Sequence, residues 1–163
     1  MPRTELERHV QPSLLDRLTD ETPDAAGDAP TTREDSVRRF RAAVQRDVER
    51  LLNSRRTTVP AGSGRPLLAV SVHQYGLPDL FAIAPGTPEG QDTLTREVRE
   101  TIARFEPRLA NVVVRLVEND QRTAPQVRFV VEGTLRMDPS PELVVFDTVV
   151  ELSSGDVDVG TPR

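Results

Sequence analysis

The last third of the chain holds three long segments rich in β-branched residues, at 111–117, 126–136 and 143–152. Turn-forming residues separate these segments, a pattern typical of neighbouring antiparallel strands. In the third segment, apolar residues such as Phe146 alternate with polar ones such as Asp147. Such alternation predicts a sheet with one covered face. The chain is therefore expected to contain a three-stranded antiparallel sheet.

A helix that could cover this sheet precedes it. Leu94, Val98, Ile102 and Phe105 recur at helical spacing, and Asp92 is placed to cap the amino end. With the first long helix described below, this pattern predicts an α+β fold in which an N-terminal arm and a helix are followed by a helix packed on the sheet.

The segment Glu106-Pro107-Arg108 stands where the helix must end. Proline disfavours helical geometry in the residue before it and has no amide hydrogen, so the backbone turns here. Glu106 and Arg108 therefore place two opposite charges between the end of the helix and the start of the first strand. From the residues alone, Glu106 and Arg108 form either an exposed charge pair of small energetic value or a functional site.

Composition limits the classes of protein that the chain can represent. Its 163 residues suit one domain with a modest core, and its net charge of -5 does not favour nucleic acid. The absence of cysteine excludes disulfides and thiolate metal sites. His9 and His73 are far apart, no apolar run is long enough for a membrane span, and the first eighteen residues are too charged for a signal peptide. We expect no cofactor or metal and a cytoplasmic location.

An N-terminal arm is predicted to carry an apolar helix. Leu14, Leu15 and Leu18 can share one face of a short helix capped by Ser13. The acidic segment 19–35 contains prolines and glycine that interrupt helices, and we interpret it as a mobile tether. The leucines then either dock on a partner or fold back onto the domain.

These patterns divide the chain into an arm and acidic linker at 1–35, a domain at 36–155 and a tail at 156–163. The first long helix of the domain is expected to begin at Ser36 and run to about Asn53. Its polar face is rich in arginine, which suits an acidic protein surface or plain solvation better than nucleic acid, because stacking aromatics are missing.

Smaller features give further expectations. Residues 67–72 are predicted to form a short strand or extended segment. Tyr75, the only tyrosine, is expected to be a packed aromatic residue with its hydroxyl at the surface. Gly133 interrupts the second strand and is expected to mark a β-bulge rather than a close backbone approach.

Glu106-Pro107-Arg108 resembles the Glu-Pro-Arg signature of the TssE family, the small baseplate wedge subunit of bacterial type VI secretion systems, which is related to a wedge protein of contractile phage tails. Further segments agree with that family in order and spacing, at 11–18, 46–55, 75–79, 127–135 and 145–148. The departures are Arg50 in place of an aromatic residue, His73 and Gln74 before Tyr75, and a longer loop at 60–66.

The resemblance implies a non-enzymatic assembly protein. It implies that Glu106, Pro107 and Arg108 engage TssF and TssG in the wedge, and that a sheet edge, for which we prefer 143–152, attaches the contractile sheath of TssB and TssC. The leucines of the arm are a further predicted contact, TssK is a further candidate partner, and the baseplate would be docked at an inner-membrane complex. Direct membrane insertion and nucleic-acid binding are not expected.

Two functions of other classes stay open at this point. A lysozyme-like peptidoglycan hydrolase would need two carboxylates across a cleft, for which Glu106 with Asp138 or Asp147 are the candidates. Arg108 beside Glu106 and the small number of aromatic residues argue against it. The other alternative is a free-standing protein-binding module.

Overall fold

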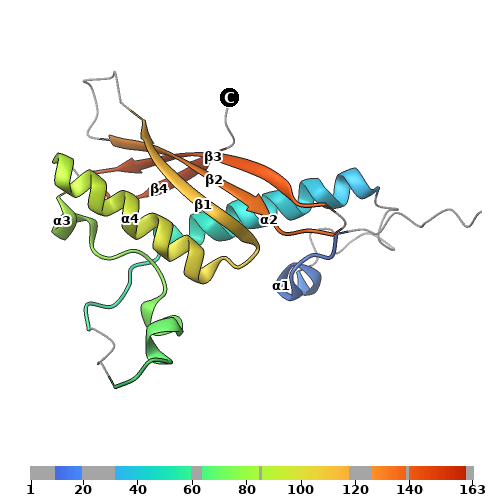
Figure 1. Ribbon diagram of the computed structural model, residues 1–163, viewed down its shortest axis with the longest axis horizontal. Helices are drawn as coiled ribbons and strands as arrows, with labels where there is room; N and C mark the ends of the chain where they lie inside the picture. Colours follow the sequence, from blue (N-terminus) through green and yellow to red (C-terminus); the bar gives the residue numbers. More distant parts are fainter. Residues whose placement is uncertain are drawn as a thin grey trace, which may run out of the picture.

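The structure, a computed structural model, describes residues 10–19, 32–59, 64–84, 86–117, 126–138 and 140–160. Its elements are α1 (Leu14–Leu18), α2 (Arg33–Asn53), η1 (Leu68–Val70), η2 (Val72–Gln74), α3 (Leu80–Ile83), α4 (Pro88–Phe105), β1 (Leu109–Val117), β2 (Gln126–Leu135), β3 (Glu142–Glu151) and β4 (Val157–Gly160). The helices α2 and α4 pack on one face of an antiparallel sheet (Figure 1). The predicted α+β class is confirmed.

The sheet has four strands in the order β1-β2-β3-β4, one more than the sequence analysis predicts. The additional strand, β4, pairs with Asp147–Val150 of β3 and lies in the range assigned to a tail. It is only four residues long and ends at Gly160, so its periodic signal is short. Because β4 covers part of one side of β3, the expectation that 143–152 is an edge strand is wrong.

Both long helices begin earlier than expected. Thr87 caps α4 and accepts a hydrogen bond from the amide of Gly90, so Asp92 lies inside the helix. Pro88 occupies the first turn, where its missing amide costs nothing. Thr32 caps α2 in place of Ser36, which is buried in the helix. The predicted mobile linker falls mainly on residues 20–31, outside the described residues.

One apolar core joins the helices to the sheet. The buried stripe of α2 faces that of α4, and both meet the inward residues of the strands; the largest fully buried side chains include Val44, Val48, Leu51, Leu52, Leu94, Val98, Ile102, Phe129, Val131, Leu135 and Phe146. Burial of each such side chain contributes about 1.5–3 kcal/mol against the unfolded chain. This core fixes the end of α4 beside the middle of α2.

The segment between α2 and α4 is not a strand. Residues 68–74 form two 3-10 turns, η1 and η2, so the extended segment predicted at 67–72 is wrong. Tyr75 packs edge-to-face on Phe105 with ring centroids 5.3 Å apart, as expected of a packed aromatic residue. Gly76 follows at φ +97°, where a side chain would collide with the carbonyl oxygen of Ser54.

A register irregularity lies opposite Gly133. Ala110 pairs with Thr134 and Val113 with Glu132, so two residues of β1 face one residue of β2. The extra residue is on β1, where Asn111 has φ +53°. The predicted bulge is thus found beside Gly133, but its extra residue belongs to β1 and not to β2, the strand that contains Gly133.

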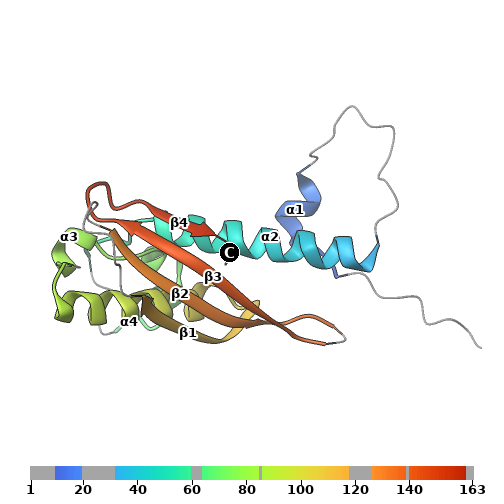
Figure 2. The same ribbon diagram turned by 90° about the horizontal axis from the view of Figure 1, so that it is seen from above.

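The two edges of the sheet differ. On β4, the amide and carbonyl of Val157 are hydrogen-bonded to Asn53, and the carbonyl of Val159 accepts from Gln45. These α2 side chains close that edge, and Figure 2 shows α2 running beside β4. Within the described part of the chain, no group outside β2 is hydrogen-bonded to the β1 backbone at 112–117. As far as the described residues go, the edge of β1 is therefore open.

Candidate functional site

The turn after α4 carries the predicted Glu-Pro-Arg segment. Glu106 is the C-cap residue of α4, and its amide donates to the carbonyl of Ile102 at 2.8 Å. Its own carbonyl accepts from the amide of Leu109, the first residue of β1, at 3.1 Å. Pro107 thus completes a tight reversal between helix and strand. The turn holds the Glu106 side chain against the molecule, where the residue is 4% exposed.

Glu106 and Arg108 form a tightly bonded pair. One carboxylate oxygen of Glu106 accepts from the Arg108 amide at 3.2 Å and from its Nε at 2.7 Å, and the other accepts from its Nη2. The guanidinium also lies 5.9 Å from the ring centroid of Phe40. Because the carboxylate is buried, the interpretation of an exposed charge pair is wrong.

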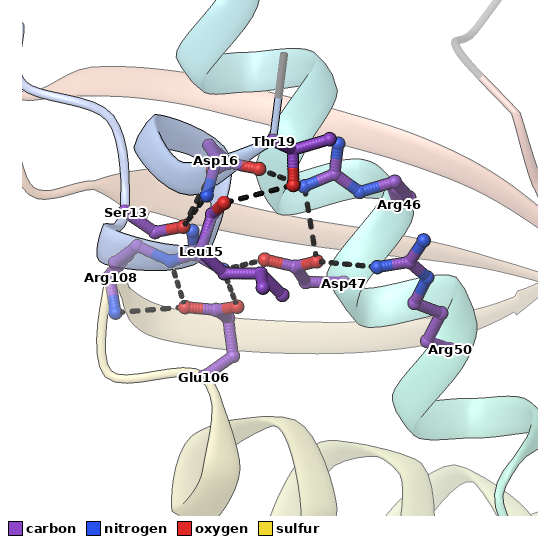
Figure 3. Close-up of polar contacts among 9 residues, drawn as sticks. All are labelled: Ser13, Leu15, Asp16, Thr19, Arg46, Asp47, Arg50, Glu106 and Arg108. Carbon is purple, nitrogen blue, oxygen red and sulfur yellow. Dashed lines mark hydrogen bonds and ion pairs between the residues drawn. The ribbon is translucent and has the colours of Figure 1, made fainter. Parts of the chain in front are cut away.

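Asp47 on α2 connects this pair to the first helix. Arg108 Nη2 donates to Asp47 Oδ2 at 2.7 Å, so one guanidinium serves two carboxylates (Figure 3). The pKa of Arg108 is raised, chiefly by its hydrogen bond to Glu106 and then, against the opposing effect of burial, by Asp47. For Tyr75, by contrast, burial raises the pKa, and the nearby charges of Asp47 and Glu106 raise it further. The tyrosine therefore lies beside the same cluster.

The arm lies against α2 on this side of the molecule. Ser13 caps α1, as predicted, and its hydroxyl also donates to Asp16 Oδ2 at 2.6 Å. Arg46 of α2 forms an ion pair with the other oxygen of Asp16 and approaches Asp47 at 3.5 Å. Val10 packs against the core, and its amide donates to Ser36 Oγ at 3.3 Å. The arm is thus folded back in this structure.

The three predicted leucines of the arm are not buried by this contact. Leu14, Leu15 and Leu18 are 72%, 61% and 75% exposed. Of the two alternatives left open by the sequence, the structure therefore shows the fold-back: the backbone and Asp16 of the arm dock on the domain, while the leucine side chains face outward. An apolar surface of this kind is available for a partner.

Arg108 also lines an open cleft of about 770 Å³. The lining residues come from the arm, α2, the turn after α4 and the end of β2; they are Val10, Gln11, Pro12, Ser13, Phe40, Arg108, Arg136, Met137 and Asp138. The Nη1 atom of Arg108 is buried and has no hydrogen-bond partner among the described residues. The cleft therefore combines apolar walls with a fixed cation.

Features needed by other functions are placed elsewhere or are not seen in the described residues. Both carboxylate oxygens of Glu106 are engaged by Arg108, and Asp147 pairs with Arg128 at 2.9 Å. Over the described ranges, no group of three or more acidic, histidine or cysteine residues could hold a metal ion. No helix in the same ranges is long and apolar enough to span a membrane.

Sequence patterns did not identify three residues of this cluster: Asp16, Arg46 and Asp47. The last two were assigned to the polar face of a helix, because helical spacing identifies the apolar stripe but not what lies across from it. The spacing of Asp47 and Arg50 does predict their contact, which is 3.8 Å. Nothing in the spacing indicates that Arg108, sixty-one residues away, binds the same carboxylate.

The chain matches a known protein family. Residues 38–140, well over half of the chain, match the family described as baseplate wedge protein gp25. The matched range includes most of α2, the whole of α4, the Glu106–Arg108 turn and the first two strands, whereas the arm, β3 and β4 lie outside it. Comparisons with curated proteins and with solved structures give no match.

Proposed function

We propose a specific role for this chain, which belongs to the gp25 family of baseplate wedge proteins. It joins TssF and TssG in the wedge of a type VI secretion baseplate, and it attaches the TssB/TssC sheath. The family supplies the structural baseplate role. The type VI assignment is supported by the resemblance of the segments quoted above. We propose that the chain acts in the cytoplasm, in a baseplate docked at an inner-membrane complex, with TssK as a further partner.

The observation that carries the TssF/TssG contact is the cleft beside Arg108. Glu106 and Asp47 accept hydrogen bonds from the Arg108 guanidinium, so the orientation of that group is set before any partner binds. Arg108 and Arg136 offer donors at the wall of the cleft, and Phe40 and Met137 offer apolar contact. Fixed donors in a partly apolar cleft suit recognition of a helix end or a carbonyl-rich turn. Glu106 acts here by positioning Arg108.

A change in the wall of the cleft tests this contact without disturbing the buried pair. Arg136 is exposed and lines the cleft, so Arg136→Glu should leave the melting temperature nearly unchanged while weakening capture of the TssF/TssG complex about ten-fold or more. Arg99→Glu is the matched control, because Arg99 is exposed on α4 and does not line the cleft. Equal capture by both variants would exclude the cleft as the wedge contact.

Sheath attachment is proposed at β1, the open edge. A strand added there would gain main-chain hydrogen bonds, and the exposed Val113, Leu116 and Val117 would provide side-chain contact. Prolines introduced one at a time at the outward-facing amides of 112–117 should block sheath assembly in cells wherever the variant still folds. Threonine at the same positions keeps the amide and is the control. Normal sheaths from every folded proline variant would exclude strand addition at β1.

A further inference from the structure

The contacts between the arm and the domain form one continuous chain of charges. Ser13 fixes one oxygen of Asp16, which leaves the other oxygen directed at Arg46 on α2 (Figure 3). Arg46 approaches Asp47, and Asp47 accepts from Arg108 at 2.7 Å. Three separate parts of the sequence, namely the arm, α2 and the turn after α4, therefore meet in a single cluster.

The exposed part of this cluster is cationic although its charges balance. The side chains of Asp16, Asp47 and Glu106 are 16%, 27% and 5% exposed. The guanidinium groups of Arg46 and Arg50 are more accessible, because these side chains are 38% and 61% exposed. The carboxylates are thus less exposed to solvent than Arg46 and Arg50, so the surface presented to a partner attracts acidic groups.

The apolar part of the surface is contributed by the arm. Leu14, Leu15 and Leu18 occupy one turn of α1, which is short enough to be matched by a single helix or a groove between two helices. The position of α1 on the domain depends on the ion pair of Asp16 with Arg46 and on the contacts of Val10. Loss of the ion pair would leave the leucines on a loosely held tether.

We infer that the Asp16–Arg46 ion pair docks α1 beside the Glu106–Arg108 cluster, so that the leucines of the arm and the arginines of α2 form one composite surface that fits an acidic amphipathic helix of a partner. The inference rests on the proposed wedge function for the identity of that partner. The docking of the arm is a property of the free chain, and it is tested separately.

The first experiment uses the free, full-length chain. The sequence contains no tryptophan, so Leu18→Trp places a single fluorescent reporter on α1. Arg46→Gln should lower the anisotropy of this reporter, because α1 is released, whereas Arg39→Gln, at an exposed position of the same helix, should not. The exchanged pair Asp16→Arg with Arg46→Asp should restore part of the parent value. Unchanged anisotropy in Arg46→Gln would overturn the docking role.

The second experiment measures capture of the TssF/TssG complex by chains without the reporter. Arg46→Gln should weaken capture about two- to five-fold by loosening the arm, and the exchanged pair should recover part of the loss. Arg50→Glu should weaken it about ten-fold by facing acidic groups with a like charge, while leaving the reporter anisotropy unchanged in the free chain. Arg39→Glu is the matched control for Arg50→Glu.

The outcomes separate this inference from the proposed function. Capture that occurs but is insensitive to Arg46→Gln and Arg50→Glu would overturn the composite surface and leave the wedge function standing. No capture by the parent chain would remove the wedge function, even if the arm is docked as described. Blue-shifted reporter emission with anionic lipid vesicles, or self-association of the parent in sedimentation, without capture of the complex, would assign the surface to a membrane or a second copy and overturn the acidic helix.

Discussion

The two regions predicted to bind partners are built in opposite ways. At the turn after α4, Glu106 is buried and Arg108 is bonded to two carboxylates. On α1, by contrast, three leucines are exposed and the helix is held by few contacts. The polar groups are inside and the apolar groups outside, the reverse of the usual arrangement. The difference suggests that the charged turn shapes the site and the arm makes contact.

This comparison is tested first at Glu106, where the largest loss of stability is expected. Glu106→Ala removes three hydrogen bonds to Arg108 and leaves the guanidinium with Asp47 alone. The free energy of unfolding should fall by about 2 kcal/mol, and the melting temperature by about 4–8 °C. Calorimetry of Glu106→Ala measures this loss of stability, and Glu100→Ala, a change at an exposed position of α4, is the control. Equal melting of the two variants would mean that the pair does not stabilise the turn.

A smaller loss is expected at Asp47. Asp47→Asn keeps the shape of the side chain but removes the charge that faces Arg46, Arg50 and Arg108. These contacts are partly exposed, so we expect a loss of about 1 kcal/mol, or about 2–4 °C in melting temperature. Glu49→Gln, on the same helix, should melt like the parent. A larger effect at Glu49 than at Asp47 would contradict the role of Asp47 as the shared acceptor.

No loss of stability is expected at the leucines. Replacing Leu14, Leu15 and Leu18 with serine should change the melting temperature by about 1 °C or less, because these side chains already face water. Capture of the TssF/TssG complex should nevertheless fall about ten-fold or more. Leu143→Ser is the control, since Leu143 is also 70% exposed but lies on β3. Early melting of the triple variant would show instead that the leucines belong to the core.

The last prediction concerns pH and expects no change across the physiological range. Burial alone would raise the pKa of Asp16, but hydrogen bonds from Ser13 and Arg46 outweigh it and lower the pKa below its ordinary value. A lowered pKa in the folded state means that the ion pair is fully formed above the unfolded pKa of about 3.9 and is lost as the pH falls through the folded value. The anisotropy of Leu18→Trp should therefore be constant from pH 8 to pH 5. A decrease in this anisotropy between pH 8 and pH 5 would contradict a lowered pKa of Asp16 in the folded state.

The sequence predicted the elements of the fold better than the relations between them. The pattern of β-branched segments and intervening turn residues located three strands within two residues of their bounds, because it is a local pattern. It missed β4, which is too short for a periodic signal, and with it the interior position of β3. The caps were displaced because Thr32 and Thr87 stand before residues that do not continue the apolar stripe.

The candidate site was located in part. Helical spacing and Pro107 identified the turn, and the three leucines identified the exposed helix. The burial of Glu106 could not be predicted from the charges of its neighbours, because it depends on Asp47 and Arg108 meeting across the core. Long-range pairing of this kind is set by the packing of α2 against α4, which single-residue patterns do not specify.

The closure of the β4 edge by Gln45 and Asn53 has a consequence for how copies of this chain can be combined. A sheet with two open edges can pass strands from one molecule to the next and continue indefinitely as a fibre. Here the long helix supplies the hydrogen bonds that a neighbouring strand would otherwise supply. Extension at β4 is thus capped, whereas the β1 edge has no such cap among the described residues. Such a molecule can begin a row of strands without itself becoming a repeating unit of that row.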